Sequence, residues 1–426
     1  MIEVSPGEMQ QLQSYLQKRA LFPPALSLPP EPGLGLIVVI PCREERGLIT
    51  TLASLWRCHR PPSPVEVLVV VNGSEADDEG VRGLNQETLE EARAWIENHR
   101  ERGLGFHLLH YPDLPKKHAG VGFARKIGLD EAVVRFHQVG NPQGVMVCLD
   151  ADCTVSDNYL VSLHDHFHQH ALSPGCAIHF EHPLEEISGH EREGIIQYEL
   201  YLRYYVWGLR FAGFPHAHHS VGSSMAVRAW AYAKQGGMNR RQGGEDFYFL
   251  QKIIPLGGFT DLRAGCVYPS PRRSHRVPFG TGRAMSDWRD GVGFWPVNDP
   301  RGFLALRDFF QGMEEVFQGR EMIDPTWISP TLQDYLDGVD FGGNLKEMQG
   351  ATSSEGTFRK RFFQWCNAFW IFKWIRFVTE AYGAVPVSEG AATLWQWLEP
   401  QEAVISRESI EWLECYRQLD RQGRVF

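Results

Sequence analysis

Three apolar runs restrict the fold of this chain more than any other feature. They lie at Leu36–Ile40, Val65–Val71 and Val145–Leu149, and segments with helical spacing separate them. Strands that are buried on both faces form near-continuous apolar runs, and the intervening helices supply the cover. The pattern therefore predicts an α/β fold with a mostly parallel sheet flanked by helices. Further strands are expected at 106–110, 176–180 and 266–268, and helices at 45–57, 85–102, 122–137 and 157–171.

The chain on either side of this region has a different pattern. Residues 6–20 have the spacing of a short helix and a Pro-rich stretch follows, so 1–34 is predicted to be a helical arm with a linker. Residues 35–285 hold the sheet, with a long helix at 194–214. Aromatic residues recur at helical spacing over 286–426 without a clear strand, which predicts a helical, aromatic-rich C-terminal region.

Charge, cysteine usage and hydropathy restrict partners and location. Acidic residues outnumber basic ones by 52 to 42, which argues against a nucleic-acid partner. The eight cysteines form no CxxC pair, a usage typical of reduced thiols. No signal peptide is visible, and the aromatic run at 362–378 is short and contains Lys373 and Arg376. We expect a cytoplasmic protein without a transmembrane segment, and a peripheral contact at the inner membrane face stays open.

Polar residues follow the predicted strands at the edge where open α/β sheets bind ligands. Residues 41–45 and Asn72-Gly73-Ser74 end the first two runs, although each alone is also an ordinary turn. Asp150 and Asp152 follow the run at 145–149. Alternate positions of an extended chain lie about 6.6 Å apart on one face, so both carboxylates can address one metal–diphosphate unit. Helix capping is the alternative, but Ser156 and Asp157 lie nearer to the next helix.

Further charged segments carry candidate ligands. Glu245-Asp246 opens a helical segment, where acids often only complement the helix dipole. The segment 116–126 combines cations with glycines ahead of a helix, and 272–282 combines arginines with His275. Each basic segment is also compatible with solvated surface charge. The histidines between 164 and 170 have helical spacing but lack the acid of a zinc HExxH motif, which favours a solvated helix face.

The order and placement of five segments resemble family 2 glycosyltransferases of the GT-A fold, the nucleotide-diphospho-sugar transferase fold. The resemblance covers roughly residues 35–285. It runs through Val39–Glu45, Val71–Ser74, Gly122–Arg125, Leu149–Asp152 and Gly244–Asp246. It implies a nucleotide-sugar donor, a divalent metal (Mn²⁺ or Mg²⁺) at the Asp-x-Asp motif and a carboxylate base.

The resemblance also implies roles for individual residues. The donor-binding set is Pro41, Glu44, Asn72, Lys116, Arg125 and Asp150. The metal set is Asp152 and Asp150, with His275 completing the shell. Asp246 is the expected base, and Glu245 is expected to position the acceptor. Asn72 replaces the usual acid of the second motif, so a UDP-sugar and a GDP-sugar both stay open as donors. The QxxRW signature of processive synthases is not evident, which favours a single sugar addition.

These inferences predict a metal-dependent, inverting, hexosyltransferase-like enzyme. Its acceptor is the hydroxyl of an unidentified glycan, lipid or small molecule. A sugar-nucleotide nucleotidyltransferase is one alternative, although its usual Gly-rich phosphate loop is missing from residues 36–45. A non-catalytic carbohydrate-binding or scaffold protein is the other alternative, and the 13 tryptophans suit it.

Overall fold

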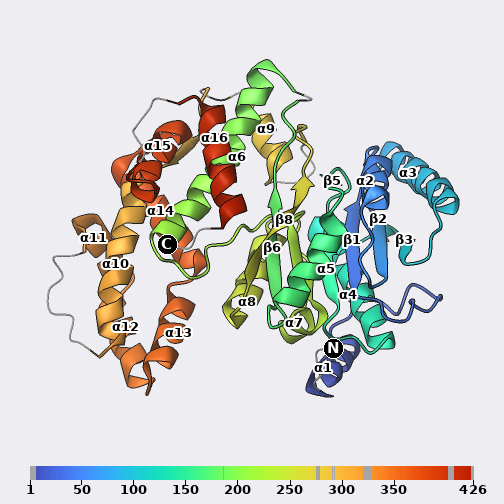
Figure 1. Cartoon of the computed structure of the whole chain (residues 1–426), viewed down its shortest axis with the longest axis horizontal. Helices are drawn as coiled ribbons and strands as arrows, with labels where there is room; N and C mark the ends of the chain where they lie inside the picture. The colour runs from blue at the N-terminus through green and yellow to red at the C-terminus, as the bar shows by residue number, and fades with distance from the viewer. Residues whose placement is uncertain are drawn as a thin grey trace. The chain divides into compact units, whose positions relative to one another are not determined.

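The chain divides into two compact units. The computed structural model describes residues 6–185, 187–274, 279–289, 291, 293–319, 328–401 and 407–423 (Figure 1). Unit 1 comprises Met1–Ile187 and Ser220–Asp287, and unit 2 comprises Ser188–His219 and Trp288–Phe426. The long helix that the sequence analysis included within 35–285 is therefore grouped with the C-terminal helices.

Unit 1 is built on one sheet, which has eight strands among the described residues, in the order β3-β2-β1-β4-β7-β6-β8-β5. Strands β3, β2, β1 and β4 are mutually parallel, as are β6 and β8, whereas β7 and β5 run antiparallel to their neighbours. The carboxyl ends of β1, β2 and β4 therefore meet at one edge. The strands are β1 Leu36–Cys42, β2 Val65–Ser74, β3 Leu104–Leu114, β4 Val145–Cys148, β5 Thr154–Val155, β6 Gly175–Phe180, β7 Met225–Arg228 and β8 Thr260–Tyr268.

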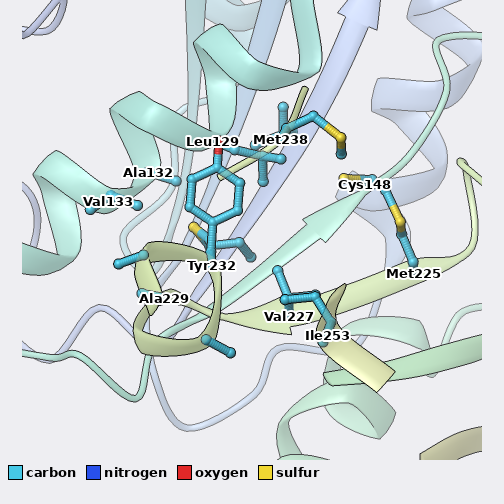
Figure 2. Close-up of a cluster of buried hydrophobic side chains, with 14 of the residues drawn as sticks. Leu129, Ala132, Val133, Cys148, Met225, Val227, Ala229, Tyr232, Met238 and Ile253 are labelled. Atoms are coloured by element: carbon cyan, nitrogen blue, oxygen red, sulfur yellow. The ribbon is translucent and has the colours of Figure 1, made fainter. Parts of the chain in front are cut away.

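Helix α4 forms the centre of the unit 1 core. Leu129 and Val133 of this helix share one buried apolar cluster with Cys148 of β4, Met225 of β7 and Tyr232 of α7, and Figure 2 shows Leu129 beside Tyr232. Burying each large apolar side chain stabilises the fold by about 1.5–3 kcal/mol. The helices of unit 1 are α1 Pro6–Lys18, α2 Leu48–Arg57, α3 Glu79–Asn98, α4 Val121–Gln138, α5 Tyr159–Gln169, α7 Ala229–Lys234, α8 Glu245–Ile253 and α9 Thr281–Arg289, with a 3₁₀ turn η1 at Ile254–Leu256.

The N-terminal arm, residues 6–34, covers polar groups of α4. The Tyr15 hydroxyl donates to Asp130 Oδ1 at 2.6 Å and accepts from Lys126 Nζ at 2.7 Å. Tyr232 donates to the same carboxylate at 2.8 Å. The carboxylate of Glu131 accepts backbone N–H groups of the arm at 2.8 and 3.2 Å. Buried charges are costly unless they are paired and hydrogen-bonded. The hydrogen bonds from the arm therefore offset the cost of burying the Asp130 and Glu131 carboxylates in α4.

Unit 2 is helical, with an aromatic core. Asn367 caps α14 by accepting backbone N–H groups, and Trp374 of that helix is fully buried and donates to the Gly302 carbonyl at 3.1 Å. The helices are α6 Gly189–Phe211, α10 Arg301–Phe317, α11 Pro330–Gly338, α12 Phe341–Gly350, α13 Glu355–Trp365, α14 Ala368–Tyr382, α15 Val387–Leu398 and α16 Ser409–Gln422. Two short antiparallel strands, β9 Pro296–Asn298 and β10 Ala384–Pro386, accompany them.

A buried ion network joins α6 to α16 within unit 2. Arg203 donates to Glu199 at 2.8 Å and also to Asp420. Arg417 donates to the two carboxylate oxygens of Glu199 at 2.8 and 3.0 Å, and Trp207 Nε1 donates to Asp420 at 2.8 Å. Each carboxylate thus has an arginine partner, which makes its burial tolerable.

The structure confirms the predicted mostly parallel sheet flanked by helices, with a helical C-terminal region. It adds the short strands β5, β7, β9 and β10, which the sequence analysis missed because two to four residues without a continuous apolar run show no pattern. Ser156 and Asp157 do not cap the next helix: the position before α5 is Asn158, without a side-chain cap. Within the described residues, no helix is both long and apolar enough to cross a membrane.

Candidate active site

Arg125 lies at the centre of the candidate site, in unit 1. It belongs to the second turn of α4 and is 3% exposed, and its guanidinium donates to Asp150, beyond β4, and to Glu245, at the start of α8. Gly222, which precedes β7, leaves room for this group, because a Cβ there would lie 2.4 Å from Arg125 Nη1. One buried cation thus ties together two sequence-predicted carboxylates that are far apart in the chain.

The Asp150–Asp152 turn offers a cluster of metal-ligand atoms. One carboxylate oxygen from each aspartate and the Cys153 sulfur lie within 4.8 Å of one another. The turn is fixed from α2, where Thr51 Oγ1 donates to the Ala151 carbonyl at 2.9 Å. Mg²⁺ and Mn²⁺ prefer carboxylate oxygens, so the two aspartates fit the metal that the resemblance implies.

Burial changes the protonation of the two acids at the start of α8. Glu245 is buried, and Asp246 is half-buried and accepts the Phe247 N–H at 2.7 Å. Burial raises the pKa of both carboxyls, and the Arg125 charge opposes that rise. Burial also acts to lower the pKa of Arg125, but Asp150 and Glu245 outweigh it and raise that pKa above its usual value. The guanidinium therefore stays charged, and the carboxyls hold a proton more readily than in water.

Two glycines let the segment before α4 approach the segment before α8. A Cβ at Gly122 would lie 2.4 Å from the Arg241 carbonyl oxygen, and one at Gly120 would lie 2.8 Å from Gln242 Cα. Gln242 Nε2 also donates to the Lys116 carbonyl at 3.2 Å. The glycines of 116–126 thus serve close packing of two chain segments, while the Lys116 residue itself is exposed.

Arg272 reaches the same sheet edge from the segment that follows β8. It donates to Asp152 at 3.0 Å and contacts the buried Glu45 of the loop after β1. Glu45 also accepts the Gly47 N–H at 2.8 Å. The sequence analysis selected Glu44 and missed Glu45, although the same loop holds both acids. A positive backbone φ of 51° at Glu44, which is rare outside glycine, was not visible in the sequence.

The remaining predicted donor residues lie around the exits of β1 and β2. Pro41 is buried within β1, and Asn72 is 2% exposed in β2. Asn85 links the two exits, because it accepts the Glu44 N–H at 2.8 Å and donates to the Asn72 carbonyl at 3.3 Å. His275 lies outside the described residues. A cavity of about 370 Å³ adjoins the β2 exit, lined by Gly73, Asp77, Arg82, Gly83, Asn85, Gln86, His110 and Pro112.

Comparison with known proteins gives similarity to solved structures alone. No protein-family model and no curated protein matches the chain. S. aureus TarS 1–349 in complex with UDP-GlcNAc is similar at 13% identity and a TM-score of 0.39, over 92% of this chain and 93% of that one. The same protein in complex with UDP gives 13% identity and 0.38, over 92% of each chain. A further S. aureus TarS structure gives 14% identity and 0.36, over 56% of this chain and 37% of that one.

Proposed function

We propose that this chain is a metal-dependent, inverting glycosyltransferase that moves a sugar from a UDP- or GDP-sugar to an acceptor hydroxyl. The observation that carries the proposal is the pairing of Arg125 with both Asp150 and Glu245, at the edge where β1, β2 and β4 end. Asp246 adds a third negative charge to the field of this guanidinium. A divalent cation bound with an anionic diphosphate complements such an acid-rich edge.

In this proposal Asp150 and Asp152 would hold Mn²⁺ or Mg²⁺, and His275 is the predicted third ligand. The metal would stabilise the negative charge that develops on the departing diphosphate. Arg125 fixes the Asp150 carboxylate through a buried ion pair. Arg272, which contacts Asp152 and is 41% exposed, turns toward the diphosphate when donor binds.

Asp246 is the proposed general base. It accepts the proton of the acceptor hydroxyl as that oxygen attacks the anomeric carbon, and its raised pKa makes it a stronger base than an exposed aspartate. Glu245, paired with Arg125, holds the first turn of α8 in place, and its predicted contact with the acceptor belongs to this proposal. Direct displacement from the face opposite the diphosphate inverts the anomeric configuration.

The nucleotide is proposed to bind at the exits of β1 and β2, against Pro41, Glu44 and Asn72. Lys116, exposed ahead of α4, supplies a further cation for the phosphates. Asn72 offers an amide donor and acceptor and no charge, which leaves both uracil and guanine open as the base. The acceptor is a glycan, a lipid or a small molecule that carries a free hydroxyl.

Metal-dependent nucleotide binding tests the proposal. UDP and GDP should raise the melting temperature with Mn²⁺ and much less after chelation, because a ligand that binds only the folded state stabilises it by about 2.7 kcal/mol at a hundred times its Kd. Asp152→Asn should abolish the metal-dependent part. Asp113→Asn is the matched control, because Asp113 is 63% exposed and pairs with Arg82 at the surface. Nucleotide affinity with metal that is unchanged in Asp152→Asn would refute the metal role.

The products separate the three functional classes. A glycosyltransferase releases nucleoside diphosphate and free or transferred sugar from a nucleotide sugar. A nucleotidyltransferase instead releases nucleoside triphosphate and sugar 1-phosphate when pyrophosphate is supplied. A carbohydrate-binding protein leaves every nucleotide sugar intact, and that result with a full donor panel and Mn²⁺ would refute an enzymatic function.

A further inference from the structure

Three side chains of different ligand types converge on β6 and β8 of unit 1. They are His179, Glu181 and Cys266, and one ligand atom from each lies within 4.8 Å of the other two. None of them belongs to the Asp150–Asp152 turn. We propose that His179, Glu181 and Cys266 form a Zn²⁺ site with one coordination position open to water. This site does not depend on the proposed transferase function.

Strand geometry explains why these side chains face one another. Phe180 of β6 is paired with Val267 of β8. Side chains alternate between the faces of a sheet, so the flanking His179, Glu181 and Cys266 share the opposite face. The register also shifts here, with four residues of β8 standing between Leu262 and Val267 against one residue of β6. Such a bulge re-aims side chains, and it brings Cys266 beside His179 of β6 and Glu181, which directly follows β6.

Hydrogen bonds hold the backbones of two of the three residues, Cys266 and Glu181. Cys266 N–H donates to Ser156 Oγ at 3.0 Å, and its carbonyl accepts the Ser156 N–H at 3.0 Å. The Glu181 N–H donates to the Val267 carbonyl at 3.0 Å. Because a metal ion would meet ligands whose backbones are already ordered, binding costs little conformational entropy.

The donor set favours zinc over the metals expected at the Asp150–Asp152 turn. An imidazole nitrogen, a thiolate and a carboxylate suit a borderline-soft ion, whereas two carboxylates suit Mg²⁺ or Mn²⁺. Tetrahedral zinc holds its ligands at about 2.0–2.3 Å, which separates them by roughly 3.3–3.8 Å from one another. The side chains of His179 and Glu181 are only 6% and 14% exposed, and their Nε2 and Oε1 atoms lie 2.6 Å apart. Zn²⁺ replaces that hydrogen bond with two metal–ligand bonds.

A zinc ion at this position has a structural consequence. It cross-links β6 to β8 six residues before Arg272, at the base of the segment that reaches Asp152 and Glu45. Because metal binds the folded chain, its binding free energy adds to the stability of unit 1.

Cobalt substitution provides the test in the full chain. The protein is stripped with a chelator and titrated with Co²⁺, and thiolate ligation produces a near-ultraviolet sulfur-to-cobalt band that histidine sites cannot produce. We expect the band to saturate at one equivalent and to disappear when Zn²⁺ is added. Cys266→Ser should abolish it and weaken zinc binding by roughly 100-fold or more. Cys415→Ser is the matched control, because Cys415 is another partly buried thiol, in α16.

The cobalt band in wild type and in Cys266→Ser decides whether the proposed zinc site exists. A wild-type protein without the band, or a band that survives in Cys266→Ser, would overturn the proposal. If Cys266→Ser does not fold, as judged by circular dichroism, zinc affinity in Glu181→Gln decides, and an affinity equal to wild type overturns it. Asp152→Asn should keep the band, so loss of nucleotide binding in that variant leaves the zinc result standing.

Discussion

Charged groups are arranged in opposite ways in the α6–α16 network of unit 2 and in the candidate site of unit 1. In unit 2, Glu199 and Asp420 are 0% and 7% exposed, and arginines that are themselves buried bond both carboxylates. In unit 1, the Asp150 and Asp152 side chains are 35% and 28% exposed at a sheet edge, and carboxylates outnumber the Arg125 guanidinium that they surround. A closed and matched network serves the fold, whereas an open and acid-rich one keeps the capacity to bind a cation.

Removing the proposed base should give the largest effect. Asp246→Asn keeps the oxygen that accepts the Phe247 N–H, but it removes the basic group, so turnover should fall by roughly 10²–10⁴-fold. Stability should not fall, because burial already disfavours the charged form. Steady-state kinetics, nucleotide affinity and a melting curve on the same preparation check this. Near-native turnover on the true acceptor would show that Asp246 is not the base.

Breaking the unit 2 network should act on stability instead. Arg203→Met leaves Glu199 and Asp420 buried with one cation fewer, and it should cost about 3–5 kcal/mol of unfolding free energy. Urea unfolding measures the loss. Nucleotide binding by the protein that remains folded should match wild type. A variant as stable as wild type would show that the network does not stabilise unit 2.

Without metal, the contributions of Asp246 and Asp420 to the free energy of unfolding should change with pH in opposite directions. Burial raises the pKa of Asp246, so its contribution to stability is present at low pH and is lost as pH rises above about 4 through the raised value. Burial acts to raise the pKa of Asp420 too, but Arg203 outweighs it and lowers that pKa. The Asp420 contribution is therefore present above about pH 4 and is lost as pH falls further. Each pKa unit is worth about 1.4 kcal/mol.

Substitution resolves these two contributions. Asp246→Asn should reduce the loss of unfolding free energy between about pH 4 and 7, and Asp420→Asn should reduce the loss below about pH 4. Urea unfolding in the presence of chelator gives both profiles. A profile of Asp246→Asn that runs parallel to wild type across the upper range would contradict a raised pKa in the candidate site.

Arg272 is expected to contribute less to stability than the unit 2 network does. Its own side chain is 41% exposed, but its partner Glu45 is 2% exposed, so Arg272→Gln leaves a buried carboxylate with one cation fewer and should cost about 1–3 kcal/mol of unfolding free energy. If it binds the diphosphate, KM for the donor should rise by about tenfold with a smaller change in kcat. Arg359→Gln, which removes a similarly exposed arginine of α13, is the control and should alter neither kinetic constant. A donor KM equal to wild type in Arg272→Gln would remove this residue from the donor site.

The sequence predicted β1, β2 and β4 because each is a continuous apolar run, and even the four residues of β4 show that pattern. It placed Asp150 at a strand exit by the same reasoning. It did not predict that Arg125 would bridge Asp150 and Glu245, because that contact needs Gly222 beside β7, a strand of four residues. The roles of these residues in catalysis stay predictions.

The contacts of α6 were also beyond prediction from sequence. Its spacing showed a helix, but the partner of Arg203 is Asp420, which lies 217 residues away. Periodicity reports which side of a helix is buried and carries no information about which distant segment buries it. The same limit applies to His179 and Cys266, whose proximity depends on a bulge that leaves no pattern in the sequence.

The N-terminal arm has a consequence for the order in which the chain folds. Tyr15 bonds Asp130 across 115 residues, so the arm leaves the ribosome long before the helix on which it docks. Contacts between such distant residues pay their loop-closure entropy before they gain energy, which makes docking a late step. Until then the Asp130 and Glu131 carboxylates lack the hydrogen bonds that the arm donates and stay hydrated. Pulsed hydrogen exchange should therefore show the arm amides of Leu21 and Ala25, which bond these carboxylates, protected after the amides of α4, whose hydrogen bonds are local.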